Sequence, residues 1–126
     1  MRYVLDTTFV IDYLRDSPHA VAALDRMMAD GDELFLNEIV ACEAWSGVRP
    51  ADVGRMRTLL NLPEFVQPGP EAAESAGRWR QDARSRGWTL SLTDALIAAA
   101  AEACEAAILT RNARDFSLTP VAVAEY

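Results

Sequence analysis

The run Tyr3-Val4-Leu5, closed by Asp6 and followed by the helix-like segment Thr8-Phe9-Val10-Ile11, decides the fold class of this chain. Three consecutive apolar residues are typical of a short buried strand, and an aspartate with threonines after it is typical of a helix start. The same alternation of short apolar strands and helical segments continues along the 126 residues. It predicts an α/β fold with a mainly parallel sheet.

The remaining elements follow from periodicity, caps and breakers. Asn37 is a predicted N-cap, while Gly47 and Gly87 are predicted to end helices. Strands are expected at residues 2–5, 34–36, 64–66, 107–109 and 121–123. Helices are expected at residues 8–14, 18–30, 38–46, 51–61, 71–86 and 93–105. With neither repeats nor a linker, residues 1–126 are predicted to form one domain.

The charge balance excludes several function classes. The net charge is −7, which argues against a general nucleic-acid binder with a broad basic surface. All 12 basic residues are arginines, so the phosphate-binding lysine of Walker-type nucleotidases is absent, as is their glycine-rich loop. Receiver domains and haloacid-dehalogenase-type phosphatases, which by resemblance combine acidic pockets with a lysine, are disfavoured for the same reason. An anionic substrate remains compatible if metal and local arginines supply the attraction.

Hydropathy predicts a globular chain away from membranes. The hydrophobic content is 51%, and the mean hydropathy is −0.01. The longest apolar stretch, residues 95–101, is far too short to cross a bilayer. The chain begins directly in a strand-like run instead of a signal sequence, and we therefore expect a cytoplasmic location.

Four carboxylates, those of Asp6, Glu43, Asp94 and Asp115, are the candidate site residues. Asp6 and Asp115 follow predicted strands, so both should face the carboxyl edge of the sheet, where ligands gather. Acidic side chains that meet there form an oxygen-lined pocket suited to Mg²⁺ or Mn²⁺.

Each carboxylate also has a purely structural interpretation. Asp6 fits a helix cap as well as a ligand. Glu43 shares a helix face with apolar residues, so we expect it to point inward and to need a partner, either an arginine or a shared metal. Asp94 fits helix capping, although Thr93 is predicted to take that role. Asp115 lies in a polar loop and fits a turn, with Thr110 and Asn112 nearby to orient a water or a phosphate.

Other polar and aromatic residues are predicted to be structural. Cys42 and Cys104 are expected to be small buried hydrophobes in a reducing compartment. The lone His19 is expected at the surface. Five acids are expected on solvated helix faces or ends, namely Asp12, Asp16, Asp25, Glu102 and Glu105. The arginines Arg78, Arg80, Arg84 and Arg86 are interpreted as a solvated face, with phosphate or an acidic partner as the alternative. Three tryptophans are expected to be core or interface anchors, namely Trp45, Trp79 and Trp88.

Taken together, the acidic motifs resemble the PIN-domain ribonucleases and, within them, the VapC-type toxins of toxin–antitoxin pairs. Order, spacing and length agree over nearly the whole chain. The matching pieces are Leu5-Asp6-Thr7-Thr8-Phe9-Val10-Ile11, Glu43-Ala44-Trp45-Ser46-Gly47, Leu92-Thr93-Asp94-Ala95-Leu96-Ile97-Ala98 and Leu109-Thr110-Arg111-Asn112-Ala113-Arg114-Asp115-Phe116. Thr8 departs from the family pattern, because an asparagine or serine is more usual there.

The resemblance implies a central parallel sheet with helices on both sides, in three layers. It implies that Mg²⁺ or Mn²⁺ is held by Asp6 and Asp94, with Glu43 and Asp115 as the other acidic positions. It also implies RNA as substrate, a homodimer, and a small VapB-type antitoxin that blocks the acidic groove. We expect no DNA binding by this chain alone.

The function expected is metal-assisted hydrolysis of RNA phosphodiester bonds by the toxin of an antitoxin-controlled pair. Bound metal would lower the pKa of a water and neutralise charge on the phosphate, while Glu43 or Asp115 orders that water or completes a second metal site. Three alternatives stay open: an RNA-processing PIN nuclease without antitoxin, a non-catalytic module whose acidic groove receives an arginine-rich partner, and a metal-dependent phosphatase.

Overall fold

Every strand of the central sheet runs parallel to its neighbours, in the order β3-β2-β1-β4-β5. The computed structural model describes residues 1–126. The strands are β1 (Arg2–Leu5), β2 (Glu33–Leu36), β3 (Glu64–Phe65), β4 (Ala107–Leu109) and β5 (Val123–Ala124). The predicted α/β class with a parallel sheet is therefore confirmed.

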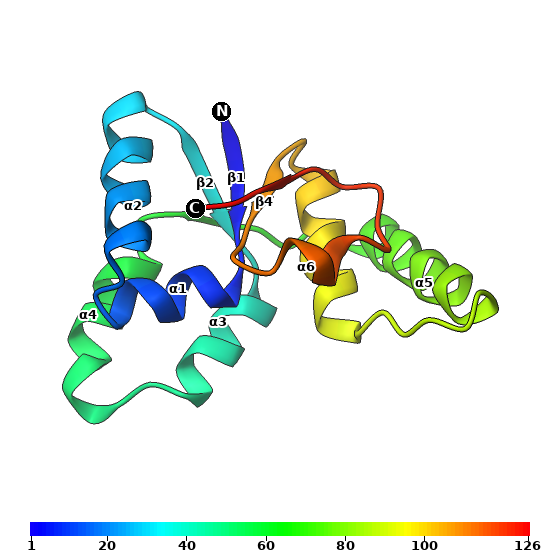
Figure 1. Cartoon of the computed structure of the whole chain (residues 1–126), viewed down its shortest axis with the longest axis horizontal. Helices are drawn as coiled ribbons and strands as arrows, with labels where there is room; N and C mark the ends of the chain where they lie inside the picture. The colour runs from blue at the N-terminus through cyan, green and yellow to red at the C-terminus, as the bar shows by residue number, and fades with distance from the viewer.

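Helices cover both faces of this sheet (Figure 1). They are α1 (Thr7–Leu14), α2 (Pro18–Asp30), α3 (Glu38–Ser46), α4 (Val53–Leu60), α5 (Pro70–Ser85) and α6 (Leu92–Ala103), with short 3-10 turns η1 (Pro50–Asp52) and η2 (Ala113–Phe116). In Figure 1, α1, α2 and α4 lie on one side of β1 and β2, and α5 and α6 lie on the other. None of the helices combines the length and the apolar character needed to span a membrane.

The strand order reverses beside β1, and this reversal positions the site. The chain leaves β1 for β2 and β3 on one side of the sheet and then crosses to β4 and β5 on the other. Val4 pairs with Phe35 of β2 and with Ile108 of β4. Ligands of open α/β sheets bind in the crevice at the carboxyl ends of strands where such a reversal occurs. A ligand site is therefore expected at the residues that follow β1 and β4.

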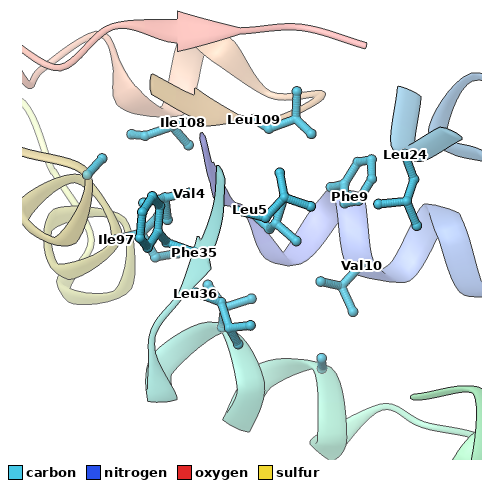
Figure 2. Packing of buried hydrophobic residues seen from close by; sticks show 14 of the residues in the cluster. Val4, Leu5, Phe9, Val10, Leu24, Phe35, Leu36, Ile97, Ile108 and Leu109 are labelled. Carbon is cyan, nitrogen blue, oxygen red and sulfur yellow. The ribbon is translucent and has the colours of Figure 1, made fainter. Parts of the chain in front are cut away.

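The core explains why the central strands read as uninterrupted apolar runs. Val4 and Leu5 of β1 are fully buried, because helices pack on both faces of a parallel sheet. Figure 2 shows Leu5 among Phe9 and Val10 of α1, with residues of β2 and β4 beside it. Ile97 reaches the same cluster from α6.

Alanines let α5 pack closely on α6. Five of the buried residues between these helices are alanines, and Leu90 completes the cluster: Ala72, Ala76, Ala83, Ala95 and Ala99. Small side chains allow the two backbones to approach closely. This packing includes Ala95 and so fixes the start of α6 against α5.

Two predicted elements differ from those observed. The last strand was expected at residues 121–123 but is Val123–Ala124, because it pairs in register with Ile108 and Leu109 of β4. The helix expected at residues 51–61 begins as η1 and continues as α4 from Val53. The other boundaries agree with the prediction within two residues.

Candidate active site

Asp6 directly follows β1 and is 6% exposed. It is the N-cap of α1, and Thr7 donates its backbone N–H to Oδ1 at 2.8 Å. Oδ2 accepts hydrogen bonds from the Thr8 hydroxyl at 3.0 Å and the Thr110 hydroxyl at 2.7 Å. Capping and site roles are therefore compatible, because three donors hold the carboxylate in one orientation.

Thr110 connects the end of β4 to this carboxylate. Its side chain is fully buried, and its hydroxyl also accepts the backbone N–H of Asn112 at 2.9 Å. The Thr8 hydroxyl lies 3.3 Å from that of Thr110 and accepts the backbone N–H of Arg111 at 3.4 Å. Thr8, the position that departs from the family pattern, thus donates a hydrogen bond from its hydroxyl to Asp6.

Glu43 lies at the edge of the site and not on the buried face of α3. The expectation that it points inward is wrong: Val40 and Ala44 take the buried positions, and Glu43 is exposed. The Thr7 hydroxyl donates to its Oε1 at 2.7 Å. This hydrogen bond connects α3 to the start of α1. Thr7 therefore bonds both acids, Glu43 through its hydroxyl and Asp6 through its backbone N–H.

Asp94 lies in the first turn of α6 and is partly buried. Burial raises its pKa above the ordinary aspartate value, a hydrogen bond with Ser91 lowers it, and the carboxylates of Asp115, Asp6 and Glu43 raise it further. Like charges have this effect only at short range. The other three predicted carboxylates are therefore close enough to Asp94 to act on its charge.

The helix that carries Asp94 is capped by Ser91, and the expectation that Thr93 caps it is wrong. The Ser91 hydroxyl accepts the backbone N–H of Asp94 at 3.0 Å. The spacing of a serine three residues before an acid is a known helix-start signal, and it identifies Ser91 from the sequence. The cap fixes where the Asp94 side chain leaves the helix.

Asp115 lies in the 3-10 turn η2 and not in an irregular loop. Its side chain is exposed, whereas the next residue, Phe116, is buried at 1% exposure. The aromatic ring anchors the turn in the core, which leaves the Asp115 carboxylate at the surface.

The donor set fits a hard divalent cation. The Asp6 carboxylate is bonded by the hydroxyls of Thr8 and Thr110 and by the backbone N–H of Thr7, with no histidine or thiol among its partners. No three acidic, histidine or cysteine side chains are close enough to chelate one ion. Mg²⁺ commonly uses one or two carboxylates and keeps several waters, so this spacing is compatible with it.

Asp12 was expected on a solvated helix face, and that expectation is wrong. It is 6% exposed, and its two oxygens bind Arg111 at 2.8 Å and the Tyr126 hydroxyl at 2.7 Å. Burial and then the hydrogen bond to Asp12 raise the pKa of Tyr126. Arg111 lies four residues before Asp115, so its ion pair with Asp12 connects α1 to the segment that carries Asp115. Sequence spacing does not reveal this contact, because Asp12 and Arg111 are 99 residues apart.

The remaining expectations are mixed. Cys42 is exposed and Cys104 half-buried, so the expectation that both are buried is wrong; the two are free thiols. His19 is at the surface, as predicted. Exposure is also observed for the other four acids, Asp16, Asp25, Glu102 and Glu105.

The arginines of α5 divide into two groups. Arg78 pairs with Glu74 at 2.7 Å and Arg86 with Asp82 at 2.8 Å, as expected of a solvated face. Arg80 instead donates to the Leu90 carbonyl, and Arg84 has no protein partner. Trp79 packs against the core, whereas Trp45 and Trp88 are exposed.

Comparisons with known proteins identify the family of the chain. The PIN domain family model matches residues 3–121. Ribonuclease VapC19 of Mycobacterium tuberculosis is 30% identical over 117 residues, which cover 93% of this chain and 94% of that protein.

Chains in several solved structures have the same fold as this chain. A toxin–antitoxin complex from Klebsiella pneumoniae contains a chain that is 26% identical with a TM-score of 0.78, covering 97% of this chain and 96% of that one. VapBC2 from Rickettsia felis, solved with a promoter DNA fragment, matches at a TM-score of 0.86 and 18% identity over 99% of this chain and 98% of that one, which shows the fold. Because the family model matches residues 3–121 and a 30% identical relative is matched over nearly its whole length, the chain belongs to the PIN-domain family.

Proposed function

We propose that this chain is a Mg²⁺- or Mn²⁺-dependent endoribonuclease and the toxin of an antitoxin-controlled pair. The observation that carries the proposal is the buried Asp6 carboxylate directly after β1, held by three hydrogen bonds and close enough to Asp94 to act on its charge. Neighbouring carboxylates repel one another, and a bound cation offsets that repulsion. The ribonuclease name of the 30% identical relative supports RNA as the substrate.

We assign the metal to Asp6 and Asp94. Asp6 is oriented by three hydrogen bonds, and Asp94 is presented by the capped first turn of α6. When bound, the cation supplies charge neutralisation at the phosphate and a lowered pKa of the attacking water. Glu43 and Asp115, both solvent-exposed, orient that water or accept its proton. Thr110 and Thr8 hold the Asp6 carboxylate in one orientation by donating to it.

Cleavage of total RNA by the purified protein tests the proposal. We expect cleavage with Mg²⁺ or Mn²⁺, none after chelation, and a loss of at least about a hundredfold in Asp94→Asn, because removal of a metal-binding carboxylate removes charge stabilisation. Asp25→Asn, an exposed acid on α2, is the matched control and should cleave normally. Wild-type protein that leaves RNA intact with both metals would disprove the proposal.

A protein partner belongs to the same proposal. Similar solved structures include VapBC assemblies from Rickettsia felis and Haemophilus influenzae, which supports a VapB-type antitoxin. A cavity of about 210 Å³ beside α1 and α3 has an apolar floor, formed by Ile11, Leu14, Ala44 and Met56, with Arg15, Arg49 and Asp52 at its edge. We assign an apolar anchor of the antitoxin to this cavity.

The partner, the assembly state and the location have separate tests. A small reading frame that overlaps the start of this one should encode a protein that co-purifies with the chain and inhibits its cleavage of RNA. Ile11→Gln should weaken that co-purification and leave RNA cleavage by the free protein unchanged, because Ile11 lines the cavity and is not among the hydrogen-bond partners of the proposed site residues. A neighbouring product that co-purifies equally with Ile11→Gln would remove the cavity from the proposal.

The assembly state and the location are tested separately. Light scattering should give the mass of a homodimer, and fractionation should place the protein in the cytoplasm.

A further inference from the structure

Trp88 is a large apolar residue that the core leaves uncovered. Its side chain is 62% exposed. It follows Gly87, whose positive φ of 79° ends α5 in the left-handed conformation. Gly87 N–H donates to the Arg84 carbonyl at 3.1 Å and Trp88 N–H to the Ala83 carbonyl at 2.9 Å. The backbone of Trp88 is thus tightly held while its indole faces solvent.

The indole separates two hollows. One, of about 350 Å³, is lined by Trp88, Arg114, Asp115, Ser117 and Leu118. The other, of about 60 Å³, is lined by Trp88, Arg80, Arg84, Thr89 and Leu90. The larger hollow joins Trp88 to Asp115, one of the four candidate acids.

The guanidinium groups beside Trp88 are unneutralised. The side chains of Arg84 and Arg114 are exposed and have neither a salt bridge nor a hydrogen bond to the protein, whereas Arg78 and Arg86 on the same helix are paired with acids. In a chain with net charge −7, two free cations flanking an exposed aromatic ring complement a polyanion.

We propose that Trp88, Arg84 and Arg114 form a nucleotide subsite for single-stranded RNA. One base stacks on the indole, and the two guanidinium groups bind phosphates on either side of it. Because Trp88 and Asp115 share a hollow, the bound nucleotide lies close to the phosphate that is cleaved. The strand is single because a base can stack on a side chain only when it has left the duplex. This inference rests on the proposed function and names how its substrate is held.

Binding of a short fluorescein-labelled single-stranded RNA of mixed sequence, measured by anisotropy in EDTA so that the RNA stays intact, tests the subsite. Trp88→Leu should weaken binding about tenfold, and Trp88→Phe, which keeps an aromatic face, should stay within about twofold of wild type. Binding of a duplex should be the same in all three proteins. Equal affinity of Trp88→Leu and wild type for the single strand would overturn the inference.

Salt dependence tests the arginines separately. Arg84→Ala should reduce the slope of log affinity against log salt by about 0.7, because one phosphate contact is lost, while Trp88→Leu leaves the slope unchanged. Arg26→Ala is the matched control: it removes an exposed, unpaired arginine from α2, at the opposite end of the molecule from α5 (Figure 1). An equal slope change in Arg26→Ala would overturn the assignment of Arg84.

The outcomes also separate this inference from the proposed function. If wild-type protein cleaves RNA with metal while Trp88→Leu binds RNA normally, only the subsite is wrong. If Trp88→Leu loses RNA binding but wild type cleaves no RNA with either metal, the subsite stands and the nuclease proposal fails. If Trp88→Leu changes the molecular mass in light scattering and not RNA affinity, the surface is a contact between copies and the subsite is overturned.

Discussion

The surroundings of Asp94 raise the pKa of its carboxyl group. Burial raises its pKa most, and the nearby carboxylates of Asp115, Asp6 and Glu43 add to the effect against the lowering by Ser91. A raised folded-state pKa means that the folded protein binds this proton more tightly than the unfolded chain does. The stabilisation is therefore fully present below the ordinary aspartate pKa and is lost as pH rises through the raised value.

The first prediction follows from that sign. In EDTA at neutral pH, Asp94→Asn should melt about 1–3 °C above wild type, a small shift because the group is only half-buried. The gap should close as the pH falls below the usual carboxyl range, where wild-type Asp94 is neutral as well. Thermal melts across a pH series measure it, with Asp25→Asn expected to show no such trend. A gap that widens in acid would contradict the stated direction.

A second prediction concerns Asp12, which holds Arg111 and Tyr126 together. Asp12→Ala leaves the Tyr126 hydroxyl and the guanidinium without their acceptor, so the free energy of unfolding should fall by about 1–3 kcal/mol. Tyr126→Phe removes a single hydrogen bond and keeps the ring against Phe9, so it should cost about 1 kcal/mol. Urea unfolding measures both. Equal losses in the two variants would mean that the contact with Arg111 contributes nothing.

At the scale of elements, α3 and α6 are joined through one buried side chain. Asn37 caps α3 by accepting the Val40 N–H at 3.1 Å and donates its amide to the Leu96 carbonyl of α6 at 3.3 Å. These helices carry Glu43 and Asp94. Their relative placement therefore depends on an amide that both caps one helix and reaches the other.

A third prediction separates these two roles. Asn37→Ala loses both contacts and should lower stability by about 1–2 kcal/mol and RNA cleavage by several-fold. Asn37→Ser keeps a capping oxygen and loses the reach to Leu96, so it should recover most of the stability and less of the cleavage. Melting temperature and initial cleavage rate are measured on the same samples. Full recovery of both by serine would show that the contact with α6 is dispensable.

At the scale of the whole molecule, the proposed metal site would link cation binding to folding. Carboxylates gathered from α1, α3, α6 and η2 exist as a group only in the folded chain, so a cation that binds them stabilises the fold.

A fourth prediction gives that linkage a magnitude. With Mg²⁺ or Mn²⁺ at a hundred times its dissociation constant, wild type should gain about 2.7 kcal/mol, or roughly 8–15 °C in melting temperature. Asp94→Asn should gain far less. Scanning calorimetry with Mg²⁺, and with Na⁺ at matched ionic strength, distinguishes specific binding from screening. An equal gain with Na⁺ would remove the metal site.

The parts of this protein that its sequence determines are local in origin. Apolar runs specify β1 and β4, and the cap at Asn37 and the glycine after α5 specify helix ends, because these signals act within a few residues. The four acids could be singled out for the same reason, since each follows a strand or opens or lines a helix.

Tertiary structure alone decided which side chains meet and how far each is buried. In the sequence, Asp12 resembles an exposed helical acid. In the folded chain, Arg111, which follows β4, and Tyr126 are hydrogen-bonded to it. Glu43 follows the apolar face of its helix in sequence yet lies outside the core, and Trp88 looks like an anchor yet stands uncovered. Burial and like-charge proximity depend on contacts between residues far apart in the chain, and no local pattern encodes those distances.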